Sequence, residues 1–95
     1  MSTAVPCYLV EWYRPAAMKE PIDNAAAKLN ETAASMSAHG SRVQLLTMLD
    51  VPTDEVLFGV FVADSASIVA DTCDRAGMPA QRLTTATDLD LTPRQ

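Results

Sequence analysis

The stretch "RVQLLTMLDVPTDEVLFGVFVA", residues 42–63, contains two apolar runs joined by "VPTD". Branched and aromatic side chains favour strands, and proline and aspartate favour turns, so the stretch predicts a β-hairpin. The second run, residues 55–63, is apolar at both alternating sets of positions. A strand that is apolar on both faces is typical of the middle of a sheet. Residues 55–63 are therefore predicted to form a central strand.

The segments on either side of the hairpin predict two more strands and two helices. "CYLVEWYR", residues 7–14, stops at a proline, and "RLTTATDL", residues 82–89, is rich in threonine. Both are predicted to be strands. Between residues 21 and 39 apolar side chains recur at steps of four and three, which predicts a helix ending at Gly40. The side chains on its apolar face are Ile22, Ala26, Leu29, Ala33 and Met36.

A second helix is predicted after the hairpin. Asp64 or Ser65 can cap its first turn, and Gly77 followed by Pro79 ends it. The resulting order β-α-β-β-α-β is that of the ferredoxin-like α+β sandwich. In that fold an antiparallel four-stranded sheet has the order 4-1-3-2 and carries both helices on one face. We expect a single domain over residues 1–95, with a core at about 7–89 and a tail at 90–95.

Composition excludes several classes of function. The chain has 95 residues and a formal net charge of -5, and its seven basic residues are scattered, so we expect no nucleic-acid partner. Its start lacks a basic segment, and no apolar run approaches the roughly 18 residues that cross a bilayer. We therefore expect a cytoplasmic protein without a membrane partner. Two cysteines without zinc-ligand spacing are expected to be free thiols.

The stretch "DTCDRAGMP", residues 71–79, places Cys73 between two carboxylates. At about 100° per residue, Cys73 projects beside Val69 and Ala76, whereas Asp71 and Asp74 point the other way. A buried thiol is thus favoured over a reactive or metal-binding one.

The first strand supplies the candidate ligand-binding residues, which are Glu11, Trp12 and Tyr13. A carboxylate in a central strand needs a partner. Without one, Glu11 could act as a general base or a ligand. The alternative is that it pairs with an arginine such as Arg42 or Arg82, or reaches solvent at the open face of the sheet. The aromatic side chains could line a pocket above Gly59, although packing against that glycine is the favoured interpretation.

Three stretches resemble a known family: "YLVE" at residues 8–11, the apolar hairpin, and "RAGMPAQRL" at residues 75–83. Together they are similar to the family catalogued as domain of unknown function 4242, which includes a nickel-binding protein. The similarity spans residues 8 to about 87, nearly the whole chain. It implies the same fold, with relatives among dimeric α+β barrels, and nickel as a possible ligand.

The residues themselves favour little metal binding. His39 is the only histidine, and nickel prefers imidazole or thiolate ligands. A histidine in the last turn of a helix also complements the helix dipole, so a solvated cap is favoured over a ligand. No cofactor is expected, and nickel is implied by resemblance alone. If a metal binds, His39 and Glu11 are its first candidate ligands, with Asp71 and Asp74 as a weaker surface pair.

Two functions are compatible with the sequence. Because two helices cover only one face of the sheet, the other face would be an exposed apolar patch, which predicts a homodimer through the open sheet face. The first function is a dimeric binding module that holds a small ligand or, less favoured, a metal ion. The alternative is a cofactor-independent enzyme of the dimeric α+β barrel type, a small monooxygenase or isomerase. A deep pocket around an unpaired Glu11 would favour the enzyme.

Overall fold

A computed structural model describes residues 6–13 and 22–87 of the chain. The elements are β1 (Pro6–Tyr13), α1 (Ile22–Ala38), β2 (Val43–Val51), the 3-10 turn η1 (Pro52–Asp54), β3 (Val56–Ala63), α2 (Ala66–Arg75) and β4 (Arg82–Thr87). The strands form one antiparallel sheet in the order β2-β3-β1-β4, which is the predicted order 4-1-3-2 counted from the other edge. The ferredoxin-like α+β fold is confirmed. The predicted strand ends at residues 14, 88 and 89, and the tail at 90–95, lie outside the described residues.

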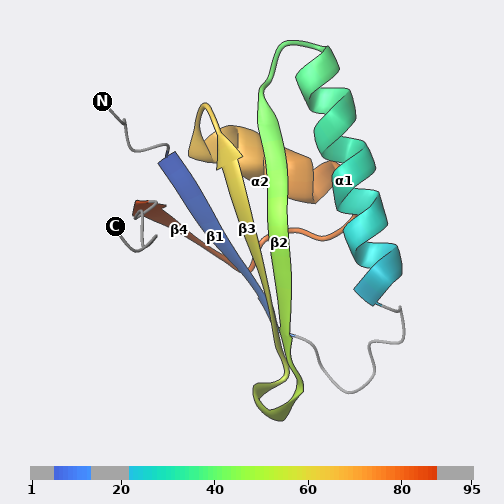
Figure 1. Ribbon diagram of the computed structural model, residues 1–95, viewed down its shortest axis with the longest axis vertical. Coiled ribbons are helices and arrows are strands. Elements are labelled where there is room, and N and C mark those ends of the chain that lie inside the picture. The colour runs from blue at the N-terminus through green and yellow to red at the C-terminus, as the bar shows by residue number, and fades with distance from the viewer. Residues whose placement is uncertain (1–5, 14–21, 88–95) are drawn as a thin grey trace, which may run out of the picture.

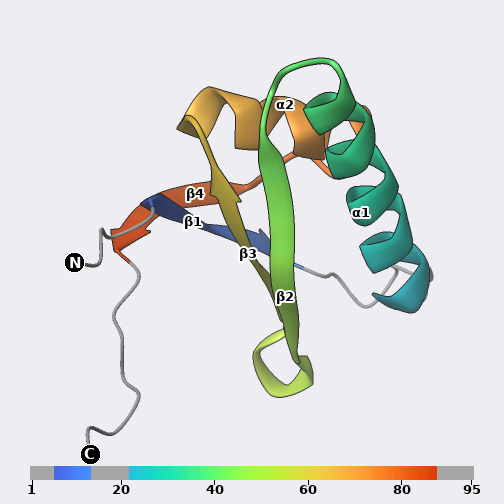
Figure 2. The same ribbon diagram turned by 45° about the horizontal axis from the view of Figure 1, so that its top comes forward.

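The two helices pack on the same face of the sheet, and no helix formed by the described residues lies on the opposite face (Figures 1 and 2). The far end of the β2–β3 hairpin, with η1 at its tip, extends beyond the helices (Figure 1). The sheet therefore has one covered face and one open face, and the hairpin contributes to both.

The helix ends follow the predicted capping residues. Ser65 caps α2, and its Oγ accepts a hydrogen bond from the backbone N–H of Ile68 at 3.3 Å. Gly40 and Gly77 follow the helices with φ of 98° and 78°, in the left-handed region that glycine adopts without strain. One detail of α1 was wrong: Ala25, not Ala26, is fully buried beside Leu29 and Ala33, because the helix is rotated slightly about its axis relative to the predicted face.

The start of β3 also differs from the prediction. Glu55 was placed in the strand, but its φ of 55° and ψ of 41° are left-handed and its backbone N–H donates to the carbonyl of Pro52 at 3.1 Å. That hydrogen bond closes η1, so the N–H of Glu55 is not available to the sheet. The ladder begins one residue later, where Val56 opposes Val51.

The core lies between the helices and the covered face. The strands contribute alternate residues to it, and α2 contributes Val69, Thr72 and Cys73. Cys73 is fully buried, as predicted, and burial together with the nearby Asp74 carboxylate raises the pKa of its thiol to about 12. Cys7 is buried as well, and the two cysteines form no disulfide with each other. A buried thiol with so high a pKa is a poor nucleophile at neutral pH.

Candidate functional site

The candidate site lies on the open face of the sheet. Residues directly opposite each other in an antiparallel ladder place their side chains on the same face, so the register defines which residues belong to it. These residues are Cys7, Leu9, Glu11 and Tyr13 of β1, Val56, Phe58, Val60 and Val62 of β3, Gln44, Thr47, Leu49 and Val51 of β2, and Arg82, Thr84 and Ala86 of β4. Most of them are apolar. Tyr13, at the end of β1, is 48% exposed, and Leu49, on the edge strand β2, is 55% exposed.

Glu11 is the one carboxylate among the open-face residues of the described strands. Its side chain is only 15% exposed, and its Oε2 lies 3.5 Å from the Nε of Arg82, which is 65% exposed. The hydroxyl of Tyr13 donates to Oε1 at 3.4 Å. Of the alternatives left open for Glu11, pairing with an arginine is the one that the structure shows, with Arg82 as the partner, whereas Arg42 pairs with Asp64. Both contacts of Glu11 are longer than an ideal hydrogen bond, so its oxygens keep acceptor capacity for a further donor.

The surroundings of this carboxylate are mixed. Along one row of the sheet, Leu49 opposes Phe58, Phe58 opposes Glu11, and Glu11 opposes Arg82. The row thus changes from exposed aliphatic to aromatic to charged over four adjacent strands. The residue that precedes β4 holds the local backbone, because Gln81 donates its N–H to the carbonyl of Glu11 at 3.1 Å and accepts from the N–H of Tyr13 through its side chain. An apolar surface bordered by an oriented carboxylate can bind a small molecule that has an apolar body and a donor group.

Trp12 lies on the opposite face from Glu11 and Tyr13. Its side chain is 4% exposed, and the indole N–H donates to the carbonyl of Met78 at 2.8 Å. Its ring covers Gly59 so closely that a Cβ built there would lie 2.9 Å from Cη2 and Cζ3. The favoured interpretation, packing against the glycine, is confirmed. The structure therefore brings Glu11 and Tyr13 together and separates Trp12 from them.

His39 follows the last residue of α1, on the helix side of the sheet, and is exposed. Its Nδ1 lies 2.8 Å from the carbonyl oxygen of Ser35, so Nδ1 is the protonated nitrogen and the ring caps the helix end. It lines a hollow of about 320 Å³ with Asp71 and Arg75 of α2. Within one chain His39 and Glu11 lie in different layers. In residues 6–13 and 22–87, no three His, Cys, Asp or Glu side chains are grouped so that they could hold a metal ion.

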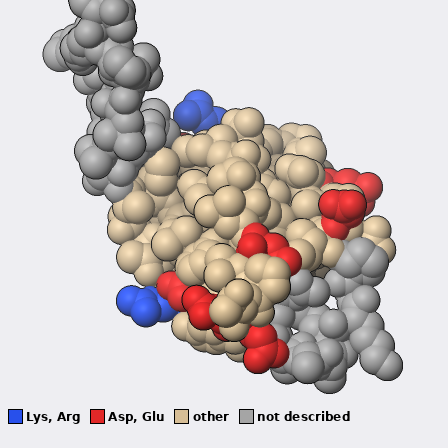
Figure 3. Space-filling view, turned by 60° about the horizontal axis from the view of Figure 1, so that its bottom comes forward, with Lys and Arg blue, Asp and Glu red and all other residues tan. Residues whose placement is uncertain are grey.

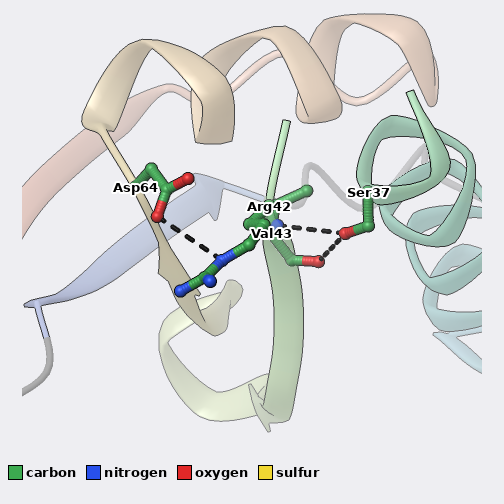
Figure 4. Close-up of polar contacts among 4 residues, drawn as sticks. All are labelled: Ser37, Arg42, Val43 and Asp64. Carbon is green, nitrogen blue, oxygen red and sulfur yellow. Dashed lines mark hydrogen bonds and ion pairs between the residues drawn. The ribbon is translucent and has the colours of Figure 1, made fainter. Parts of the chain in front are cut away.

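A larger hollow of about 410 Å³ lies where β2 begins and β3 ends. Arg42 and Asp64 line this hollow and form an ion pair, with 3.7 Å between Arg42 Nε and Asp64 Oδ1 (Figure 4). Both side chains are largely exposed. The hydroxyl of Ser37 makes two hydrogen bonds to the backbone of Val43. Its Oγ donates to the Val43 carbonyl at 2.9 Å and accepts from the Val43 N–H at 3.1 Å. This contact joins the end of α1 to the start of β2. Neither hollow is lined by Glu11 or Tyr13.

Charge is unevenly distributed over the surface. In the space-filling view, the basic side chains lie apart from one another, while carboxylates gather in groups (Figure 3). A phosphate backbone is recognised by clustered lysine and arginine, and this view shows no such cluster. Among the described helices, none is long and apolar enough to span a bilayer.

Comparisons of the chain with family models, with curated proteins and with solved structures give no match. The resemblance to the domain of unknown function 4242 family stays a prediction, and the arguments that follow are based on the site itself.

Proposed function

We propose that the protein is a homodimeric binding module whose two open sheet faces enclose a small ligand beside Glu11. The observation that carries the proposal is the position of this carboxylate, which is 15% exposed on a largely apolar face and has long contacts to Arg82 at 3.5 Å and to Tyr13 at 3.4 Å. An oriented acceptor with spare capacity, next to apolar side chains, is the composition of a small-molecule site.

The homodimer is supported by the size of the open face. Four strands of six to nine residues, spaced about 4.8 Å apart and rising about 3.3 Å per residue, give a footprint of roughly 500 Å². Because side chains roughen the surface, the accessible area that a partner would bury is larger than this footprint. A stable interface buries about 800 Å² per partner. A second copy that covers the whole face therefore approaches the area that a stable dimer needs.

Charge supports a second copy as well. The chain has a formal net charge of -5, so two copies repel each other over most of their surface. On the open face the charged side chains contributed by the described strands are Glu11 and Arg82, which cancel. Two copies consequently meet with least repulsion through this face.

The chemistry of the site defines the ligand class. We expect a compound with an apolar ring or chain and an amine or hydroxyl group that donates to Glu11, with its apolar part against Leu9 and Phe58. The enzyme alternative has less support, because Glu11 has an arginine partner and lines neither the hollow at the start of β2 nor the one beside His39. We place the module in the cytoplasm, where cysteines that form no disulfide, such as Cys7 and Cys73, remain reduced.

The ligand proposal is tested by ligand-observed NMR with benzylamine, benzyl alcohol and benzoate at millimolar concentration. We expect the amine and the alcohol to bind and benzoate to bind more weakly. Glu11→Gln should abolish the preference for the amine, because its neutral amide no longer attracts a cation. Glu31→Gln, on the exposed surface of α1, is the matched control and should leave binding unchanged. Equal binding of all three probes, or a preference that survives Glu11→Gln, would contradict the proposal.

Nickel is a weaker candidate ligand. His39 and Glu11 belong to different layers of one chain, so a shared site would need one residue from each copy. Calorimetric titration with nickel of protein purified without a histidine tag is expected to show no micromolar site. A micromolar site that is lost in His39→Ala or Glu11→Gln would replace the small molecule with a metal ion in this proposal.

A further inference from the structure

The hollow of about 320 Å³ beside His39 lies in the helix layer, where α2 runs next to α1 (Figures 1 and 2). Both helices contribute side chains to it. Met36, which packs against the core, is its apolar part. The other lining residues are Ser35, His39, Ser41, Asp71 and Arg75. Two helices thus assemble a polar lining in a different layer from the open-face site at Glu11.

The two charged side chains of this hollow are not paired. Asp71 and Arg75 are four residues apart on α2, a spacing at which a carboxylate and a guanidinium can form an ion pair. In the described part of the chain, however, no ion pair joins either of them to another residue. The acceptors of the Asp71 carboxylate and the donors of the Arg75 guanidinium are therefore available to a ligand.

His39 adds an acceptor to the same hollow. Its Nδ1 donates to the carbonyl oxygen of Ser35 at 2.8 Å, so Nε2 of the neutral ring keeps its lone pair. The hydroxyls of Ser35 and Ser41 can donate or accept. The lining consequently combines two acceptors, on Asp71 and His39, with one strong donor, on Arg75.

This combination disfavours a ligand with a single charge. An anion would meet the Asp71 carboxylate and the C-terminal end of α1, which carries partial negative charge. A metal ion would meet the Arg75 guanidinium, and the described residues contain no group of three His, Cys, Asp or Glu side chains that could hold it. A ligand that carries both charges has a partner for each of them.

The spacing of the charged residues limits the length of such a ligand. Side chains four residues apart on a helix have Cβ atoms about 5–6 Å apart, so an ammonium and a carboxylate on the same carbon can bridge them. The ammonium has three N–H donors, which match the Asp71 carboxylate, Nε2 of His39 and a serine hydroxyl. The carboxylate can accept two parallel hydrogen bonds from the guanidinium of Arg75.

We propose that the hollow between α1 and α2 binds a small free α-amino acid, with Asp71 and His39 holding its ammonium group and Arg75 its carboxylate. A volume of about 320 Å³ is sufficient for such a molecule. The site is independent of the one proposed at Glu11. Because it lies in the helix layer, it also stays accessible when the open face is covered.

NMR titration of isotopically labelled protein with glycine at constant ionic strength tests the inference. Saturable shifts are expected in the amides of residues 35–41 and 71–75, with a dissociation constant on the order of 1–10 mM. Methylamine and acetate each carry one of the two charges and should bind at least about tenfold more weakly. Betaine keeps both charges but has no N–H donor, and it should be weakened to a similar extent.

Variants identify the groups that hold glycine. Asp71→Asn and Arg75→Gln should each weaken its binding at least about tenfold, because each removes a charged partner. Asp74→Asn is the matched control, since Asp74 is an exposed carboxylate of the same helix that does not line the hollow, and it should leave binding unchanged. Circular dichroism of these variants should match the wild type, because all three side chains are exposed.

Three outcomes would overturn the inference. The first is equal binding of glycine, methylamine and acetate, which would indicate general ionic attraction. The second is an Asp74→Asn variant that weakens glycine binding as much as Asp71→Asn does. The third is the absence of saturable shifts up to about 50 mM glycine. Glu11→Gln should leave glycine binding unchanged, so this test and that of the open-face ligand succeed or fail separately.

Discussion

Neighbouring residues of strand β3 point to opposite faces of the sheet, and the two faces differ greatly in their environment. Leu57 and Phe61 are fully buried beneath the helices, whereas Phe58 and Val60, on the other face, are only half-buried. Both sets are equally apolar. The difference shows that hydrophobicity alone does not tell which face the chain covers by itself. The helices cover the first face, and we propose that a second copy of the chain covers the other.

Phenylalanine occurs once on each face of β3, which gives a matched pair of variants. Phe61→Ala is expected to lower the free energy of unfolding by about 3–5 kcal/mol, because it leaves a cavity in the core. Phe58→Ala should cost less, and its cost should depend on protein concentration if Phe58 is buried only in the dimer. Chemical denaturation at two concentrations measures both. Equal, concentration-independent losses would show that the two faces do not differ in this way.

Gly59 tests how tightly the covered face is packed. In Gly59→Ala the new Cβ would lie 2.9 Å from the Trp12 ring atoms Cη2 and Cζ3 and 3.3 Å from Phe61 Cε1. Aromatic rings in a packed core cannot move freely, so we expect a loss of about 1–3 kcal/mol. Val60→Ala, the neighbour on the open face, is the control for loss of a half-buried side chain. Adding Trp12→Phe to Gly59→Ala should recover part of the packing loss, and full additivity would locate the strain elsewhere.

The burial of Cys73 in the core should make the stability of the folded chain depend on pH. Burial raises the pKa of the Cys73 thiol from the ordinary value of 9.0 to about 12, so the folded chain keeps the thiol protonated. The stabilisation is complete below about pH 9 and is lost as the pH rises towards 12, because the unfolded thiol ionises first. Relative to Cys73→Ala, the wild type should lose stability over that range.

A second variant at this position tests burial at neutral pH. Cys73→Ser should cost about 1–3 kcal/mol if its hydroxyl finds no partner. The thiol should react slowly with a thiol reagent in the native protein and quickly after denaturation. Rapid labelling of the native protein would contradict its burial.

The ion pair on the open face is expected to have the smallest effect on the stability of a single chain. Arg82 is 65% exposed, and exposed pairs contribute about 0–1 kcal/mol. Arg82→Gln should therefore change the free energy of unfolding of dilute protein little, while it weakens the dimer in low salt more than in high salt. A loss as large as that in Phe61→Ala would mean that the pair is part of the covered core.

Local signals predicted most of the fold. Gly40, Gly77 and Ser65 mark helix ends, and the two-sided apolar run marks the central strand, because these patterns reflect backbone geometry and burial. A β-bulge in β2, where Leu46 is an extra residue between Leu45 and Thr47, was missed, although its signal is present: apolar residues at positions 45, 46, 48 and 49 do not alternate. A strict period of two cannot place Leu45 and Met48 on the same face unless one residue is extra.

The candidate site was only partly predictable. Alternation alone already places Trp12 opposite to Glu11 and Tyr13, so grouping the three in one site conflicts with the strand period. The choice of Arg82 rather than Arg42 as the partner of Glu11 depends on strand order, which pairs β1 with β4. Composition and local pattern do not contain that information. It follows from the topology once the strands are assembled.

The central claim is that the open face is buried against a second copy of the chain, and sedimentation velocity tests it most directly. At micromolar concentration the wild type is expected to sediment as a dimer of the 10.2 kDa chain. Leu49→Glu, which places a charge on the open face, should sediment as a folded monomer, and Ala27→Glu on α1 should remain a dimer. A wild-type chain that sediments as a monomer throughout the micromolar range would contradict the account.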